Sequence, residues 1–178
     1  MNVKRISIAV VALIAISGVV VYWQSKPAWR HPIALFSLLR QRPEALLPVP
    51  VDGVRARQLS DSWGSPRPGG RRHQGIDIFA RRGTPIRSAT RGIVMEVGDN
   101  HLGGHMVKVF GPGGEWHYYA HMDHFANARA GDVIARGVIL GFVGNSGDAI
   151  TTPCHLHYGI YSPLGGATDP YPRLVPAT

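Results

Sequence analysis

The chain has 178 residues, enough for one ordinary domain and an appendage but too few for two full domains. Its 19 basic and 11 acidic side chains give a formal net charge of +8, and six of the basic residues precede position 50 against a single glutamate. Neither a dense stripe of Lys and Arg nor interleaved stacking aromatics occurs, which argues against a nucleic-acid partner. The one cysteine, Cys154, excludes an internal disulfide.

The N-terminal residues predict a membrane anchor. Residues 1–5 are short and basic, and residues 6–23 are apolar apart from two serines and one glycine, about the ~18 residues of a minimal span. A cleavable signal peptide is the alternative, because residues 15–17 resemble a small-x-small cleavage site. The apolar run continues past that site, so we expect an uncleaved, single-pass transmembrane helix in the inner (cytoplasmic) membrane. The rest of the chain would then lie in the periplasm or extracytoplasmic space.

A proline-rich segment separates this span from the rest of the chain. Residues 24–52 contain five prolines, and we expect them to form a tether. A short helix is predicted over residues 33–41, because Pro32 can begin a helix and Pro43 ends it. The globular domain is then expected over residues 53–178.

From Val54 onward, short β-branched runs alternate with glycine-containing turns, and no long amphipathic helix is evident. This spacing is typical of an all-β domain. The expected strands lie over residues 75–79, 85–89, 92–97, 106–110, 116–121, 138–143 and 155–161. Because permissive glycine turns join successive strands, the sequence predicts an antiparallel sheet with a sandwich-like arrangement.

Three segments carry histidine or aspartate at even spacings, which in a strand puts the side chains on one face. They contain His73 and Asp77, then His117, Tyr119 and His121, then His155 and His157. Imidazole and carboxylate are common zinc ligands, and a catalytic zinc site uses three protein ligands with one position left for water. Three or four ligands can therefore converge if these strands are neighbours. The other histidines, at positions 31, 101, 105 and 124, together with His117, are expected to be structural or solvent-facing.

The motifs His73-x-x-x-Asp77, Tyr119-Ala120-His121-Met122 and His155-Leu156-His157-Tyr158 follow one another in this order. This set resembles the M23 (LytM/lysostaphin-type) family of peptidoglycan endopeptidases. The resemblance covers about residues 62–170, essentially the whole globular part, and its motif set is specific.

The resemblance implies a zinc-dependent endopeptidase that hydrolyses peptide bonds in peptidoglycan stem peptides or crosslinks. His73, Asp77 and His157 match the family's zinc ligands, for one Zn²⁺ per domain. His121 and His155 match two further histidines that orient or deprotonate the attacking water and stabilise the oxyanion. The implied partners are peptidoglycan and, through the N-terminal helix, the inner membrane.

Two positions depart from the family pattern. Gly159 stands where many members have glutamate, and Cys154 stands where proline or a small residue is commoner. We interpret Cys154 as a small buried thiol rather than a nucleophile, because no neighbouring feature would activate it. The arginine pairs at 71–72 and 81–82 could line a groove for the carboxylates of stem peptides, or form a solvated basic surface.

Two other functions are compatible with this domain. One is a catalytically inactive M23-like wall-binding or regulatory module that activates other wall hydrolases. The other is a metal-dependent peptidase whose substrate lies outside the wall. All five motif positions carry the expected chemistry, which favours the wall enzyme over the inactive module.

Overall fold

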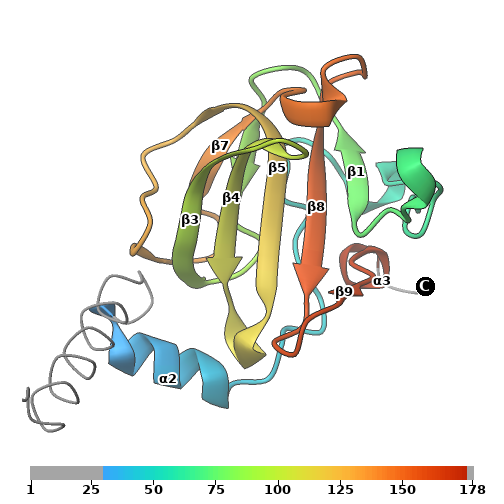
Figure 1. Cartoon of the computed structure of the whole chain (residues 1–178). Coiled ribbons are helices and arrows are strands. Elements are labelled where there is room, and N and C mark those ends of the chain that lie inside the picture. Colours follow the sequence, from blue (N-terminus) through green and yellow to red (C-terminus); the bar gives the residue numbers. More distant parts are fainter. Residues whose placement is uncertain (1–29, 176–178) are drawn as a thin grey trace, which may run out of the picture.

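The computed structural model describes residues 30–175, which form a mostly β-structured domain (Figure 1). Its strands are β1 (Ile76–Phe79), β2 (Pro85–Arg87), β3 (Gly92–Asn100), β4 (Gly104–Phe110), β5 (Trp116–Phe125), β6 (Val133–Ile134), β7 (Ile139–Val143), β8 (His155–Tyr161) and β9 (Ala167–Thr168). Its helices are α2 (Pro32–Arg40) and α3 (Tyr171–Leu174). Short 3-10 turns are η2 (Ala56–Gln58), η3 (Pro68–Gly70), η4 (Pro112–Gly114) and η5 (Gly147–Ala149).

Every strand pairing in the described sheet is antiparallel, as the sequence predicted. The strand order along the main path of the sheet is β1-β8-β5-β4-β3-β6. Off this path, β7 pairs with β5, and β2 pairs with β7. All seven strands expected from the sequence are present within a few residues of their predicted bounds. The sequence reading missed β6 and β9, because strands of two residues are too short to show alternation.

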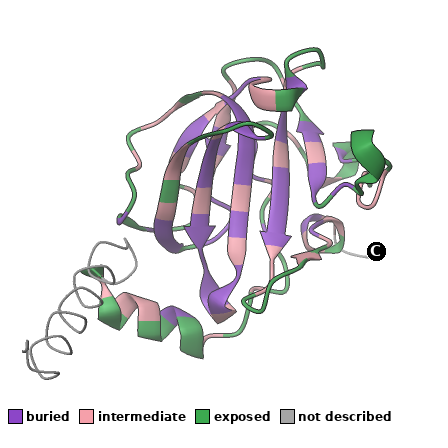
Figure 2. Ribbon diagram, viewed as in Figure 1, coloured by how far each residue is buried: buried purple, intermediate pink, exposed green. Residues whose placement is uncertain are grey.

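The core is built by alternation along the strands. On β8, Leu156, Tyr158 and Ile160 are fully buried in the main hydrophobic cluster. The same cluster includes Ile86 from β2 and Leu140 from β7. Strands β2 and β7 therefore share one core with the strands of the main path. Figure 2 shows the buried residues concentrated along these strands. The residues that alternate with these three lie on the opposite face of β8, outside the core.

The segment that precedes the sheet is fixed to it. Leu47 and Val51 are buried in the main core, and the Leu47 N–H donates to the Arg173 carbonyl oxygen at 2.8 Å. The helix predicted over residues 33–41 is confirmed as α2, and its Leu38 is buried. The described part of the expected tether therefore packs against the domain. The predicted boundary at residue 53 stays a prediction.

None of the helices within residues 30–175 has the length and apolar composition needed to cross a bilayer. The span predicted over residues 6–23 lies outside the described residues. It stays a prediction.

His117 is a buried structural histidine. Its side chain is 1% exposed, and its Nδ1 lies 2.7 Å from the hydroxyl of Tyr158. Burial, reinforced by the positive charge of Arg173, lowers the pKa of His117 to about 3. Burial raises the pKa of Tyr119, which packs beside Tyr158, to about 12. Both groups are therefore neutral around pH 7.

This buried imidazole should make folding stability depend on pH. Unfolded His117 takes a proton near its ordinary pKa of about 6.5, whereas folded His117 resists protonation down to about pH 3. Its contribution is therefore fully present above about pH 6.5 and is lost as the pH falls from there toward 3, by up to about 1.4 kcal/mol per pH unit. Urea unfolding of wild type and His117→Gln at pH 7 and pH 5 measures this loss. The variant should lose less stability than wild type over that interval; equal losses would contradict the assignment.

Candidate metal centre

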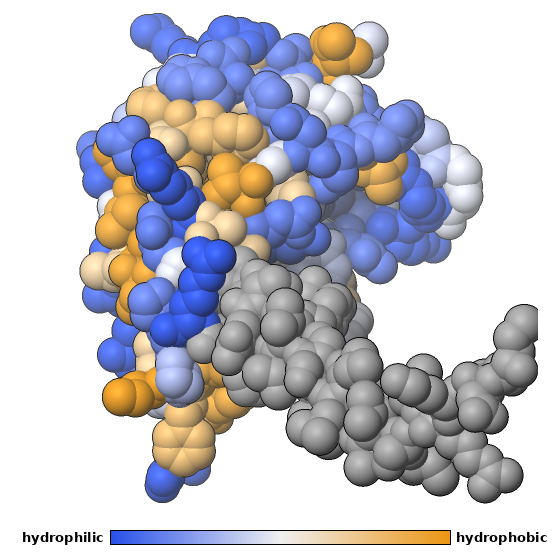
Figure 3. Space-filling view, turned by 60° about the vertical axis from the view of Figure 1, so that its left-hand side comes forward, coloured by the Kyte–Doolittle hydropathy of each residue, from blue (hydrophilic) through white to orange (hydrophobic). Residues whose placement is uncertain are grey.

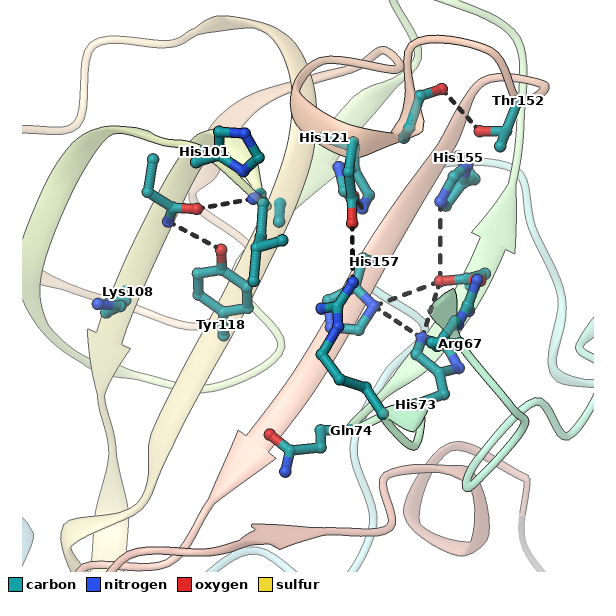
Figure 4. Close-up of a pocket in the computed structure, with 18 of the residues that line it drawn as sticks. Arg67, His73, Gln74, His101, Lys108, Tyr118, His121, Thr152, His155 and His157 are labelled. Atoms are coloured by element: carbon teal, nitrogen blue, oxygen red, sulfur yellow. Dashed lines mark hydrogen bonds and ion pairs between the residues drawn. The ribbon is translucent and has the colours of Figure 1, made fainter. Parts of the chain in front are cut away.

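Three side chains from two neighbouring strands and the preceding loop converge at one end of β8. In the β1–β8 ladder, Asp77 lies directly opposite His157, so both side chains project from the same face. His73 precedes β1 and reaches the same point. Asp77 Oδ1 lies 3.1 Å from His73 Nε2 and 3.3 Å from His157 Nδ1, and the two ring nitrogens lie 2.8 Å apart. Figure 4 shows the rings of His73 and His157 turned toward this point.

The geometry of these three atoms fits a single small divalent cation. Among the described residues they form the one group of three potential ligands whose donor atoms all lie within 4.8 Å of one another. Two ligands of a tetrahedral zinc with bonds of ~2.0–2.1 Å are separated by ~3.3 Å, close to the observed 2.8–3.3 Å. Two imidazoles and one carboxylate also form a donor set that zinc prefers.

Hydrogen bonds behind the ligands set their orientation. The Nδ1 of His73 donates to the Ser62 carbonyl oxygen at 2.7 Å, which leaves the Nε2 lone pair pointing at the site. The Ser62 hydroxyl accepts the backbone N–H of Asp77 at 3.1 Å. One residue on the loop before the first motif thus holds two of the three potential ligands.

Asp77 remains ionised although it is largely buried. Burial alone would raise its pKa, but hydrogen bonds from His157, His73 and Arg67 outweigh this and hold the pKa well below its usual range. The Arg67 guanidinium pairs with Oδ2, which leaves Oδ1 to face the imidazoles. The sequence analysis did not identify Arg67. Its approach to Asp77 depends on the Pro-Gly-Gly turn η3, which folds the chain back, and no residue spacing in the sequence signals such a contact.

Two more imidazoles face the same point. His155 Nδ1 donates to the Pro153 carbonyl oxygen and His121 Nδ1 to that of Ser146, each at 2.8 Å, so both Nε2 atoms point into the site. Their ring centroids lie 5.0 Å apart. His155 Nε2 is 3.7 Å from Asp77 Oδ1. Burial lowers the pKa of His121 to about 4, which keeps that ring neutral at pH 7.

The prediction that His117, Tyr119 and His121 share one face is wrong for His121. His121 has a φ of +64°, and it is the one non-glycine residue in the described chain with a positive φ. This left-handed conformation breaks the alternation, and the strand register shifts just beyond it. His121 therefore lines the cleft beside Ala120, while His117 and Tyr119 stay in the core. Strained backbone at such a place is typical of a functional residue.

The five residues lie at one end of a groove of about 1440 Å³. Aromatic side chains also line the groove: the Tyr118 ring lies 6.0 Å from that of His157, centroid to centroid, while Trp116 and Tyr161 pair with each other farther along the strands. Arg71 and Arg72 line the groove as well, and Arg71 Nη2 lies 3.6 Å from Asp148 Oδ2. Arg82 instead pairs with Asp123, outside the groove. The two arginine pairs thus have different surroundings.

Of the histidines expected to be structural or solvent-facing, His105 and His124 lie outside the groove and His101 lines it. His105 pairs with Asp99, His124 pairs with Asp123, and both are more than a third exposed. His101 lines the groove, a position that sequence reasoning did not assign to it. Cys154 is partly buried against the main core, in accord with a structural thiol.

Comparison with known proteins identifies the relatives of this domain. The sequence model of peptidase family M23 matches residues 71–170. An L-Ala–D-Glu endopeptidase of Bacillus subtilis (strain 168) is 40% identical over 124 residues, which cover 64% of this chain and 38% of that protein. This chain thus spans less than two fifths of that relative's length.

Solved structures resemble the fold as well. The catalytic domain of a point mutant of the prophage-encoded M23 protein EnpA from Enterococcus faecalis matches with 32% identity and a TM-score of 0.59. The match covers 71% of this chain and 95% of that one. The catalytic domain of lysostaphin from Staphylococcus simulans matches with 28% identity and a TM-score of 0.58, covering 66% of this chain and 92% of that one.

Gly75 should control how closely β1 approaches His157. A Cβ at position 75 would lie 2.5 Å from the Tyr158 carbonyl oxygen and 2.7 Å from His157 Cε1. Both distances are far inside van der Waals contact, so Gly75→Ala must push the His157 ring away from Asp77. We expect zinc affinity, measured by competition with a chromophoric chelator, to fall at least tenfold.

The matched control is Gly53→Ala, whose added Cβ meets nothing within 4 Å although its φ of +75° imposes backbone strain. Unchanged zinc affinity in a folded Gly75→Ala protein would show that the close approach is not needed.

Proposed function

The chain belongs to peptidase family M23, whose members act as peptidoglycan endopeptidases, and we propose that it is a zinc-dependent endopeptidase of peptidoglycan. Its substrates are peptide bonds in stem peptides or crosslinks. The observation that carries the proposal is the triangle formed by His73, Asp77 and His157, which matches the size and donor chemistry of a zinc site. The groove that leads away from this triangle gives room for an extended peptide.

Each residue of the site has a separate role in this proposal. His73 Nε2, His157 Nδ1 and Asp77 Oδ1 hold the zinc ion, and Arg67 keeps the second carboxylate oxygen of Asp77 engaged. When bound, zinc lowers the pKa of water toward ~7 and polarises a carbonyl oxygen. His155 and His121 each direct Nε2 at the space beside the ligands. They are therefore placed to accept a proton from water and to return it to the leaving amine.

The charge of the groove favours a peptide that bears carboxylates. Arg71, Arg72 and Lys108 line the groove; Arg71 faces Asp148 and Lys108 pairs with Glu96, so within residues 30–175 Arg72 is the member of this set that makes no ion pair. A relative with 40% identity is named for cleavage between L-Ala and D-Glu, a bond beside an acidic residue. We place the substrate in the stem peptide for these reasons. Peptidoglycan lies outside the cytoplasmic membrane, which agrees with the proposed anchor at residues 6–23 and a periplasmic or extracytoplasmic domain.

The test is digestion of isolated sacculi by the purified full chain, followed by mass spectrometry of the released fragments. We expect cleaved stem peptides or crosslinks, loss of cleavage with a chelator, and recovery when zinc is restored. A zinc-loaded protein that leaves all fragments unchanged would favour the inactive wall-binding module instead. The full chain is preferred to residues 53–178, because that fragment lacks the buried Leu47 and Val51.

Substitutions separate the two kinds of histidine. His155→Ala should keep its zinc and lose about 10²-fold or more in activity, as expected when a general acid or base is removed. His157→Ala should lose both zinc and activity. His124→Ala is the control, because His124 is exposed and does not line the groove. Zinc content by mass spectrometry decides the assignment: loss of zinc from His155→Ala would reverse the roles of the two residues.

A further inference from the structure

Helix α2 has apolar side chains on both of its faces. The inner face, formed by Ala34, Leu35 and Leu38, packs on a small cluster that includes Ile93 and Phe110. On the outer face, Ile33, Phe36 and Leu39 are 85%, 61% and 52% exposed. A surface helix usually presents polar residues to water, and one that is apolar all round is normally covered on every side. We therefore expect a partner to cover the apolar outer face of α2.

The exposed apolar surface continues beyond the helix. Around Gly114, the side chain of Leu39 lies beside that of Pro163: a Cβ at position 114 would be 3.4 Å from Leu39 Cδ2 and 3.2 Å from Pro163 Cβ. The next residue, Leu164, is 99% exposed. Figure 3 shows apolar side chains collected at the lower end of the described surface. Contiguous patches of this kind mark interaction sites on proteins.

The chain segment that contains α2 is basic. From Gln24 to Pro43 it carries four basic residues and no aspartate or glutamate; the acidic residues that follow, Glu44 and Glu115, pair with Arg136 and Arg173. Arg40 lies on the outer face of α2, where its guanidinium carbon is 5.5 Å from the centre of the Phe36 ring. A long basic side chain that covers an apolar ring can bury its stem and keep its charge at a polar boundary. This combination suits a layer that is apolar inside and anionic at its surface.

We propose that the outer face of α2 docks on the surface of a lipid bilayer with anionic headgroups, with Ile33, Phe36 and Leu39 inserted between the lipids. An apolar face flanked by basic residues is how interfacial helices bind membranes. The length of the chain supports a bilayer over a second copy of the protein. Only eight residues separate the apolar run 6–23 from Pro32, and they span at most ~28 Å. If that run is anchored in a bilayer, α2 must lie close to the same surface.

Docking through α2 would orient the catalytic groove. Trp116, which packs against the same small cluster as the inner face of α2, pairs with Tyr161 at the end of β8 opposite His155. Four residue steps from the ligand His157 to Tyr161 correspond to ~13 Å of strand. The metal centre is thus held roughly 13 Å or more beyond the Tyr161 end of β8, and the groove lined by Trp116 at that end also takes in the metal centre. The membrane contact would therefore present the site to a wall that lies above the bilayer.

The experiment uses the full chain in nanodiscs of phosphatidylethanolamine and phosphatidylglycerol. An environment-sensitive fluorophore is attached at position 36 of Phe36→Cys in a Cys154→Ser background, and lipids with a nitroxide near the headgroup serve as quenchers. The matched control carries the same fluorophore at position 150, through Ile150→Cys. Ile150 is also apolar and 72% exposed but follows η5, between Ala149 and Thr151, which line the groove.

We expect quenching at position 36 to be at least threefold stronger than at position 150. Adding Ile33→Glu and Leu39→Glu should reduce it to the control level; both residues are exposed, so the fold should tolerate them. Equal, weak quenching at the two positions would overturn the proposal. Disulfide formation between the thiols of two copies of the unlabelled Phe36→Cys, Cys154→Ser protein, with no quenching of the labelled protein, would assign this surface to a second copy and overturn the proposal as well.

Discussion

The register between β1 and β8 is the constraint on which the rest of the site depends. It sets Asp77 directly opposite His157, and the adjacent β5 sets Ala120 opposite the same histidine. A slip of one residue would turn every side chain of a strand to the other face. Leu156 and Tyr158, fully buried beside His157, make such a slip costly, since it would bring imidazoles into the core and leave two large apolar side chains in the groove. The hydrophobic core thus fixes the geometry of the polar site on its opposite face.

The site is held from behind by the backbone as well as by side chains. Three of its imidazoles donate Nδ1 to a carbonyl oxygen, of Ser62, Ser146 or Pro153, and each of these carbonyls lies in a loop. The loops are in turn anchored to the sheet: the Ser146 hydroxyl, for example, donates to the Met122 carbonyl at the kink after His121. Rings restrained in this way lose little freedom when a ligand arrives, and such preorganisation is a large part of what an enzyme contributes to catalysis.

Alternation was enough to predict seven of the nine described strands and the shared face of His155 and His157, because those positions obey the period of two. It failed at His121, where a single left-handed residue reverses the direction of the side chain. It could not find Arg67 or Ser62, which act from irregular loops whose path is set by tertiary packing. It also could not show that Leu47 and Val51 belong to the core, because prolines around them conceal any strand pattern.

The electrostatics of the site suit a cation. Asp77 Oδ1 has three imidazole nitrogens within 3.7 Å, yet burial lowers the pKa of His157, so the protein disfavours a positive charge on that ring. A buried carboxylate needs a compensating positive charge, and Arg67 satisfies only its outer oxygen. The inner oxygen of Asp77 and the ring nitrogens of His73 and His157 are left directed at one point. A divalent ion at that point satisfies all three atoms together, which the side chains cannot do for one another.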